Sequence, residues 1–427
     1  MNLQDTFHRS FLKASEGAIA NAITKMIVKK AAAKGLVLTK RQRARILAGV
    51  RAKRIDSSLF PKTKRSVRIA FTKRDIAKVE RMIGRALAML PRLVHDESTA
   101  IATWSLPRLH ESWPERARFE DGRRRSFEKH IASWWQHPLD MLGMMLTITN
   151  ELTTTLADEA RQSSSAIALR SALFRLQIRA CQLGYEVQTL LAAGLPDAAY
   201  ARWRTMHEIA ITALYIRERG EVMAERYLAH HVIEAVAAAE SWNRHRRRLK
   251  TRSVRTASVR RLQAKKAALL QRFLSNYGEP YGWAAENATE KIRSFATIEA
   301  RVDMEHWRPY YKAASLRVHA SPQALFNRFS SYKSDVLIAG PSVYGMADAG
   351  QGAAISLNQI TSAVASVEDV TLDTIVALKI LNQLALETID AFVAVQRRLE
   401  RAEDRRRRKN MRARAARLRL ARTKGTN

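Results

Sequence analysis

Residues 181–242 read CQLGYEVQTLLAAGLPDAAYARWRTMHEIAITALYIRERGEVMAERYLAHHVIEAVAAAESW, and they carry the clearest secondary-structure signal in the chain. Apolar side chains recur there at steps of three and four residues, which is the period of one helical face. Gly194 and Gly220 are typical helix ends, and Pro196 can begin a helix without losing a hydrogen bond. The pattern predicts three consecutive helices, at about residues 160–193, 196–219 and 221–248.

Short loops make consecutive helices antiparallel neighbours, so we expect an all-α fold with an antiparallel helical bundle core. A long C-terminal helix is predicted from about Thr371, ending in a basic tail. The predicted divisions are a basic helical N-terminal arm at 1–95, a Trp- and Pro-containing connector at 96–159, a core domain at 160–395 with a basic hairpin at 243–277 and a glycine-rich loop at 340–356, and a basic tail at 396–427.

Three segments carry specific expectations. The helices of residues 1–70 have little apolar area to bury, so we expect an arm that is partly ordered at most. Prolines at 107, 114 and 138 indicate that residues 95–138 are too broken for a long helix. The stretch 340–352 lacks the Gly-Lys-Ser/Thr ending of a phosphate-binding loop, and we expect it to be a mobile surface loop.

Composition excludes several classes of protein. The 427 residues contain one cysteine, Cys181, so no disulfide framework is possible and a cytoplasmic location is expected. No run of about 20 apolar residues is present, so no membrane span is expected. His230 and Glu234 have a ligand-compatible spacing, but no second pair accompanies them, and we expect no metal site and no cofactor.

The formal net charge of +34 is segregated along the chain. The net charge is +18 in residues 1–95, 0 in 96–180, −3 in 181–242, +11 in 243–312, −3 in 313–395 and +11 in 396–427. Segregated positive charge attracts a polyanion, of which nucleic acid is the commonest in a cytoplasm and acidic lipid the next. The alternative is a set of solvated arms with no dedicated ligand.

Nucleic acid is therefore the expected partner, RNA before DNA, and a homodimer is a further possibility. The residues expected to bind nucleic acid are Arg41, Arg45, Arg246, Arg247, Arg248, Arg406 and Arg407. Tryptophans at 134 and 135, after the basic run 123–125, form either a second such surface or ordinary packing on the bundle.

Three short runs resemble a known family. They are Tyr185-Glu186 through Gly194-Leu195-Pro196-Asp197-Ala198, Arg204-Thr205-Met206-His207-Glu208-Ile209-Ala210 and Tyr227-Leu228-Ala229-His230. With a later segment from Tyr311 to Ser321, they make residues 165–335, approximately, similar to the bacterial helical family called domain of unknown function 5677. The resemblance implies an all-helical domain and no particular activity.

A second likeness is shorter. Arg202 and His207, with four residues between them, resemble the motif of HEPN ribonucleases, an arginine followed after four to six residues by a histidine. The same spacing occurs elsewhere in this arginine-rich chain, for example at Arg226 and His231, so the spacing alone has little weight.

These residues lead to a catalytic hypothesis. Metal-independent RNA cleavage needs a base for the 2′-hydroxyl proton and a cation for the developing phosphorane charge. We expect Arg204, His207, Glu208 and His319 to form such a site, with Arg202, Tyr227, His230, His231 and Ser315 as supporting residues. The competing hypothesis is a non-enzymatic nucleic-acid-binding or assembly protein whose polar core residues hold the bundle together. Whether the protein is an enzyme stays open at this point.

Overall fold

The computed structural model describes residues 3–61, 67–160, 165–273, 275–287, 289–319, 321–326, 338–367 and 371–424. These residues form helices, turns and loops without any strand, which confirms the all-α prediction. Residues 161–164, where the first central helix was expected to begin, Ala320 of the later family segment, and the last three residues of the basic tail lie outside the described ranges. The chain divides into two compact units, residues 1–120 and 121–427.

The first unit contains three elements and the beginning of a fourth. These are α1 (Leu3–Ala32), α2 (Lys40–Arg51), the 3-10 turn η1 (Ser57–Leu59) and the start of α3 (Lys73–Ala160). Ile27, Ala31, Leu38 and Ile46 form a small buried cluster between them. Thr39 caps α2, accepting from the Gln42 amide at 3.3 Å while Gln42 accepts from the Thr39 amide at 2.9 Å. Residues 3–61 are therefore more structured than expected, because α1 and α2 bury apolar area against each other.

The expectation that residues 95–138 are too broken for a long helix is wrong. Helix α3 is 88 residues long and passes through Pro107, Pro114 and Pro138. A proline removes one hydrogen bond and bends a helix locally, and neighbouring turns can continue the helix on both sides. Beyond Pro138, tertiary packing also holds the helix, since Leu142 and Met145 are fully buried in the main core.

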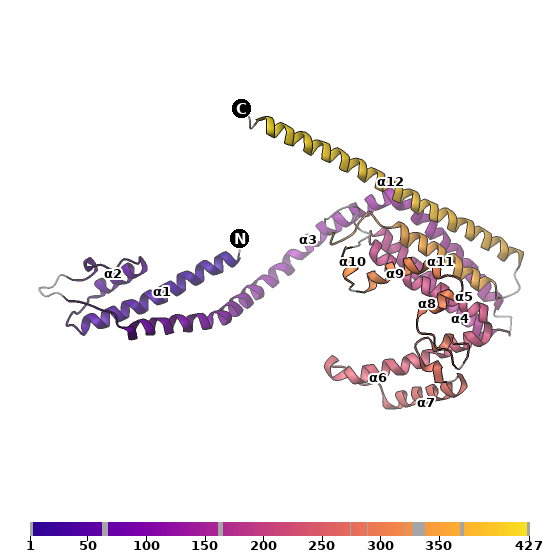
Figure 1. The fold of residues 1–427 in the computed structure, drawn as a ribbon, viewed down its shortest axis with the longest axis horizontal. Coiled ribbons are helices and arrows are strands. Elements are labelled where there is room, and N and C mark those ends of the chain that lie inside the picture. The colour runs from indigo at the N-terminus through magenta and orange to yellow at the C-terminus, as the bar shows by residue number, and fades with distance from the viewer. Residues whose placement is uncertain are drawn as a thin grey trace. The chain divides into compact units, whose positions relative to one another are not determined.

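The second unit contains the remaining helices, of which Figure 1 labels the α-helices. They are α4 (Ile167–Ala192), α5 (Pro196–Ala229), α6 (His231–Leu249), α7 (Thr256–Phe273), η2 (Ser275–Gly278), η3 (Gly282–Ala284), α8 (Phe295–Ala300), η4 (Glu305–Trp307), α9 (Arg308–Val318), α10 (Pro322–Phe326), α11 (Ala347–Ala365) and α12 (Leu372–Lys424). Helix α5 is central, since α4, α8, α9 and α11 all contact it. The long C-terminal helix is confirmed as α12.

The turn at Gly194 is confirmed, since its φ is 74° and α5 begins at Pro196. The second stop, at Gly220, is also confirmed. Gly220 has the non-helical angles φ 74° and ψ −156°, so α5 consists of two helical segments, at 196–219 and 221–229. The predicted third helix, 221–248, is itself divided by a turn at His230, after which α6 begins at His231. Glu221 accepts hydrogen bonds from the backbone amides of Ala168 and Leu169 at 2.8 and 2.7 Å, which ties the interruption to the start of α4.

The predicted mobile loop at 340–352 is wrong from Ala347 onward, where α11 begins. Gly350 lies against the Phe392 ring of α12, and Gly352 lies against the Trp203 indole of α5. A side chain at either position would hold these helices apart, so the glycines permit close packing inside the bundle. Ser356 on the same helix accepts a hydrogen bond from the Trp203 indole at 3.3 Å.

Gly352→Ala should therefore destabilise the protein. The added methyl group meets the buried Trp203 ring, and overpacking of this kind costs about 1–3 kcal/mol. The measurement is the free energy of unfolding from denaturant titration. Gly122→Ala is the matched control, because Gly122 lies in α3 with nothing within 4 Å of the added atom. An equal effect of the two substitutions would contradict the packing argument.

Candidate functional site

Two parts of the family-like sequence meet on one side of α5. Arg204 donates from Nε to the Ser315 hydroxyl at 2.9 Å and from Nη2 to the Tyr311 hydroxyl at 2.6 Å. Tyr311 donates to Glu208 Oε1 at 2.5 Å, and Arg204 and Glu208 pair at 2.9 Å. The i, i+4 spacing on α5 and on α9 places all four side chains on facing stripes. The side chains of Arg204 and Glu208 are 21% and 29% exposed, so water reaches this group, which we call the Tyr311 cluster.

Electrostatics keeps the Tyr311 phenol protonated. Burial, followed by the hydrogen bond to Glu208, raises the pKa of Tyr311 well above its ordinary value. The guanidinium groups of Arg204 and Arg308 each lie 4.8 Å from the centre of its ring. The cluster thus contains a carboxylate, a neutral phenol and the Arg204 cation, and Arg308 adds a second cation at the other contact with the Tyr311 ring.

His207 is buried next to this cluster, with its ring centroid 6.1 Å from that of Tyr311. Its Nε2 lies 3.1 Å from Glu299 Oε1, and Arg308 Nη1 donates to Glu299 Oε2 at 2.5 Å. The side chain of His207 is 2% exposed and that of Glu299 is not exposed at all. The rings of Trp203, Phe295, Trp307 and Tyr311 surround the imidazole. His207 therefore lacks the contact with solvent that a base acting on a polymer requires in this conformation.

The other expected site residues do not join the cluster. His319 is exposed at the end of α9. Arg202 lies 3.7 Å from Glu186, on another face of α5 from His207, so the HEPN-like spacing does not bring its two residues together.

Three expected supporting residues lie on the last turns of α5 and at the start of α6. Tyr227 packs edge-on against Trp283, with ring centroids 4.8 Å apart. His230 Nε2 lies 3.0 Å from the Glu279 carbonyl, and His231 Nδ1 lies 2.7 Å from the Leu228 carbonyl. These contacts fix helix ends and loops. Of the five expected supporting residues, Ser315 belongs to the Tyr311 cluster, where it accepts from Arg204.

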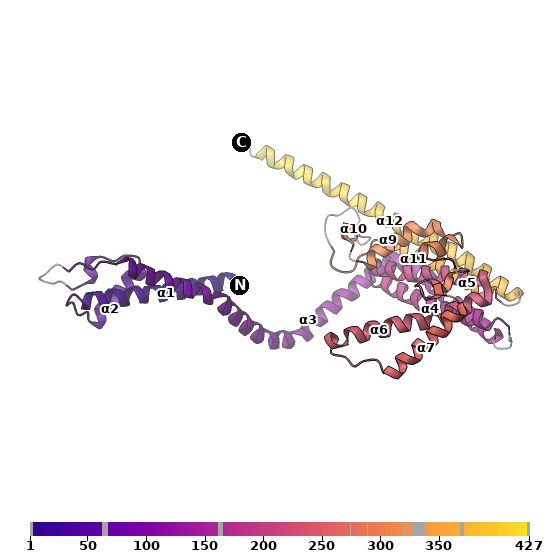
Figure 2. The ribbon, with the colours of Figure 1, turned by 60° about the horizontal axis from the view of Figure 1, so that its bottom comes forward.

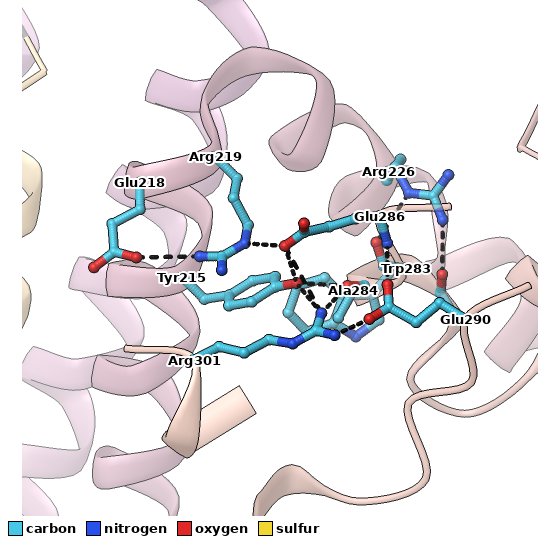
Figure 3. A network of polar contacts seen from close by, with 10 residues as sticks. Tyr215, Glu218, Arg219, Arg226, Trp283, Ala284, Glu286, Glu290 and Arg301 are labelled. Atoms are coloured by element: carbon cyan, nitrogen blue, oxygen red, sulfur yellow. Dashed lines mark hydrogen bonds and ion pairs between the residues drawn. The ribbon is translucent and has the colours of Figure 1, made fainter. Parts of the chain in front are cut away.

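Sequence reasoning missed a second polar network, which Figure 3 shows. Tyr215 donates to the Ala284 carbonyl at 2.6 Å and accepts from Arg301 at 3.0 Å. Arg219 donates to Glu286 at 2.6 Å, and Arg301 pairs with Glu290. One sequence signal could have revealed it, because the acids of the basic segment 243–312 all follow Gly278. Acids gathered in one part of a basic segment predict ion pairs with nearby arginines, as Glu286 and Glu290 form here.

The residues expected to bind nucleic acid lie on three separate elements. Arg41 and Arg45 are exposed on α2, and Arg45 donates to the Ser58 carbonyl at 3.1 Å. Arg247 and Arg248 are exposed near the end of α6, with Arg246 partly covered. Arg406 and Arg407 both pair with Glu403 on α12.

The aromatic run of α3 is part of the core. Trp135 is fully buried and donates to the Val343 carbonyl at 2.9 Å, while Arg398 lies over Trp134. Of the two alternatives for Trp134 and Trp135, a nucleic-acid surface or packing on the bundle, the structure shows packing. Within the described ranges, no three histidine, cysteine or acidic residues are grouped to hold a metal ion. No helix there has the length and apolar character to cross a bilayer.

Comparison with known proteins gives one match. Residues 170–335 match the model of a family of unknown function, DUF5677, which confirms the resemblance expected for about residues 165–335. No curated protein and no solved structure matches the chain. The matched segment contains the whole Tyr311 cluster as well as His207 and Glu299.

Glu299→Gln should destabilise the protein strongly. Removing the charge leaves Arg308 and His207 without their buried partner, and breaking such a pair costs about 3–5 kcal/mol. Denaturant titration measures the loss. Glu286→Gln is the matched control, because Glu286 also bonds an arginine but its side chain is 49% exposed, and we expect no more than about 1 kcal/mol there. Similar losses for both variants would show that burial is not the cause.

His230 should make stability depend on pH. Burial, the largest cause, lowers the pKa of His230 below its ordinary value of 6.5, so folding favours the neutral imidazole. Stability is then fully present above pH 6.5 and is lost as the pH falls through the lower folded pKa. Between pH 7 and 5 the wild type should lose more unfolding free energy than His230→Gln. His231→Gln, at the adjacent exposed position, should behave like the wild type; a loss in His230→Gln as large as in the wild type would exclude this role.

Proposed function

We propose that the protein binds nucleic acid and that the polar residues of its bundle serve to hold the helices together. One observation carries the proposal: arginines on or against α5 have carboxylate or carbonyl partners, whereas nine exposed bases of the α6–α7 hairpin form no ion pair within the described residues. On or against α5, carboxylates or carbonyls engage Arg204, Arg219, Arg226, Arg301, Arg308 and Arg317.

The hairpin is different in composition and in pairing. Residues 243–278 contain no acid. Nine of its ten exposed Arg and Lys residues are Arg244, Arg247, Arg248, Lys250, Arg252, Arg255, Arg260, Arg261 and Lys265. Within the part of the chain that the structure describes, no ion pair involves any of these nine, whereas the tenth, Arg272, pairs with Glu225 at 2.6 Å. Like charges at this density repel one another, and a polyanion removes that repulsion and releases its own counterions.

The hairpin is also held in place well enough to present these charges. Asn243 accepts a hydrogen bond from the Val254 amide at 2.9 Å, and the Trp242 indole donates to the Arg252 carbonyl at 3.0 Å. The two bonds brace the loop between α6 and α7, which lie side by side in Figures 1 and 2. Arg41 and Arg45 on α2, and Arg406 and Arg407 on α12, are further candidates for phosphate contacts.

A metal-independent ribonuclease is the second candidate function, and the partial exposure of Arg204 and Glu208 favours it. In this reading Glu208 takes the 2′-hydroxyl proton, and Arg204 with Arg308 stabilises the phosphorane. Glu208 replaces the buried His207 as the base, and His319 has no assigned step. The nucleic-acid-binding reading is preferred because all groups of the Tyr311 cluster already bond one another.

Binding across a salt series tests the proposal. The full chain should bind labelled RNA and DNA at about 50 mM salt, with log K falling linearly with log [salt] by about 0.9 per phosphate contacted in duplex DNA. The RNA should remain intact with and without chelator. Absence of binding to either polymer at low salt would exclude the proposal. RNA cleavage that Glu208→Gln abolishes would instead establish the second candidate.

A further inference from the structure

We propose that the tip of the α6–α7 hairpin binds duplex nucleic acid across a groove, contacting phosphates of both strands without reading bases. This inference rests on the proposed function and specifies its ligand. It comes from three features of the hairpin: where its charges lie, how wide it is, and which side chains accompany the charges.

The charges lie at the tip. The bases of α6 are confined to its last turns, from Arg244 to Arg248, and those of α7, apart from Arg272, run from Arg260 to Lys266. Arg272, near the root, is compensated by Glu225. Loop residues 250–255 connect the two groups and add further bases. The root of the hairpin is apolar instead, since Ile233, Val236 and Phe273 are buried. A ligand that seeks positive charge therefore meets the free end of the hairpin.

The width of the tip restricts how it can bind. Two packed helices have axes about 8–10 Å apart and diameters of about 10 Å, so the pair is about 20 Å across. The major groove of B-form DNA is about 12 Å wide and admits one helix. With its two helices side by side across a groove, the hairpin is too wide to enter, and the helices can rest on the phosphate rows at either side. A single strand has one phosphate row and cannot satisfy both helices together.

The accompanying side chains favour phosphate contacts over stacking on bases. Between residues 243 and 272 the sequence contains no phenylalanine, tyrosine or tryptophan, whereas single-strand binding relies on aromatic stacking. The adjacent Trp242 is 45% exposed, and its indole is held by the hydrogen bond to the Arg252 carbonyl. Of the three amide side chains of this range, Asn243 accepts from the Val254 amide, Gln263 lies 3.5 Å from Glu240, and Gln271 lies at the root of the hairpin, away from the tip. Arginine and lysine at fixed positions on two helices favour phosphate contacts and a rigid phosphate array.

The test uses the full chain and labelled oligonucleotides of equal length: duplex DNA, duplex RNA and unstructured single-stranded RNA. We expect the duplexes to bind more tightly than single-stranded RNA and with a steeper dependence on salt. Comparing duplex DNA with duplex RNA shows whether the B form or the A form fits the hairpin better. Two duplexes of unrelated sequence should bind alike. The variant with Arg247, Arg248, Arg260 and Arg261 all changed to Gln should reduce the slope of log K against log [salt] by about 3–4.

The matched control changes four exposed bases outside the hairpin to Gln, namely Arg175, Lys291, Lys312 and Lys379. It removes the same charge and should leave the slope within about one unit of the wild type. If single strands bind as tightly as duplexes, or if the control variant loses as much as the hairpin variant, the duplex inference is wrong although nucleic-acid binding stands. If no polymer binds at all, the proposed function fails as well.

Discussion

The carboxylate of Glu299 has no contact with water, and its burial is the constraint on which the bundle depends. A buried charge is tolerated only when hydrogen bonds and an opposite charge compensate it. His207 and Arg308 provide that compensation, and they come from the central helix and from the start of α9. The chain between Phe273 and Arg308 has only short helices, so this pairing, together with the Tyr215 network, holds it against α5.

The need for compensation also applies to the arginines of the second unit. An arginine near α5 lies opposite a carboxylate or carbonyl, as Arg204 lies opposite Glu208 and Arg317 opposite Asp197. Bases without such partners are found on the hairpin, where water solvates them. The low net charge of the bundle segments thus follows from the pairing of their arginines with carboxylates. The exposed bases of the hairpin tip have no such partners among the described residues and keep their positive charge.

Much of the fold was predictable from local patterns, because helical periodicity and the Gly194–Pro196 turn act over a few residues. Resemblance assigned the segment Tyr311–Ser321 to the same family as the Arg204 run, but it did not predict the contact of Arg204 with Tyr311. That contact depends on α9 returning to α5, which no local pattern encodes. Gly350 and Gly352 misled the prediction because glycine disfavours an isolated helix, whereas here close packing against Phe392 and Trp203 requires it. The burial of His207 depends on Glu299, 92 residues away, and spacing on α5 alone cannot reveal it.

The charged tip of the hairpin and the buried ion pairs of the bundle are far enough apart to affect each other little. Residues 236 and 247 of α6 are about 16 Å apart along the helix, which exceeds the screening length of about 10 Å at 0.1 M salt. The bundle's carboxylates therefore neutralise the tip very little, and the tip's positive charge places little electrostatic cost on the buried pairs. Bases moved toward Val236 would face the apolar root, where Ile233, Val236 and Phe273 are buried. Distance along one helix thus leaves the positive charge of the tip uncompensated without destabilising the core.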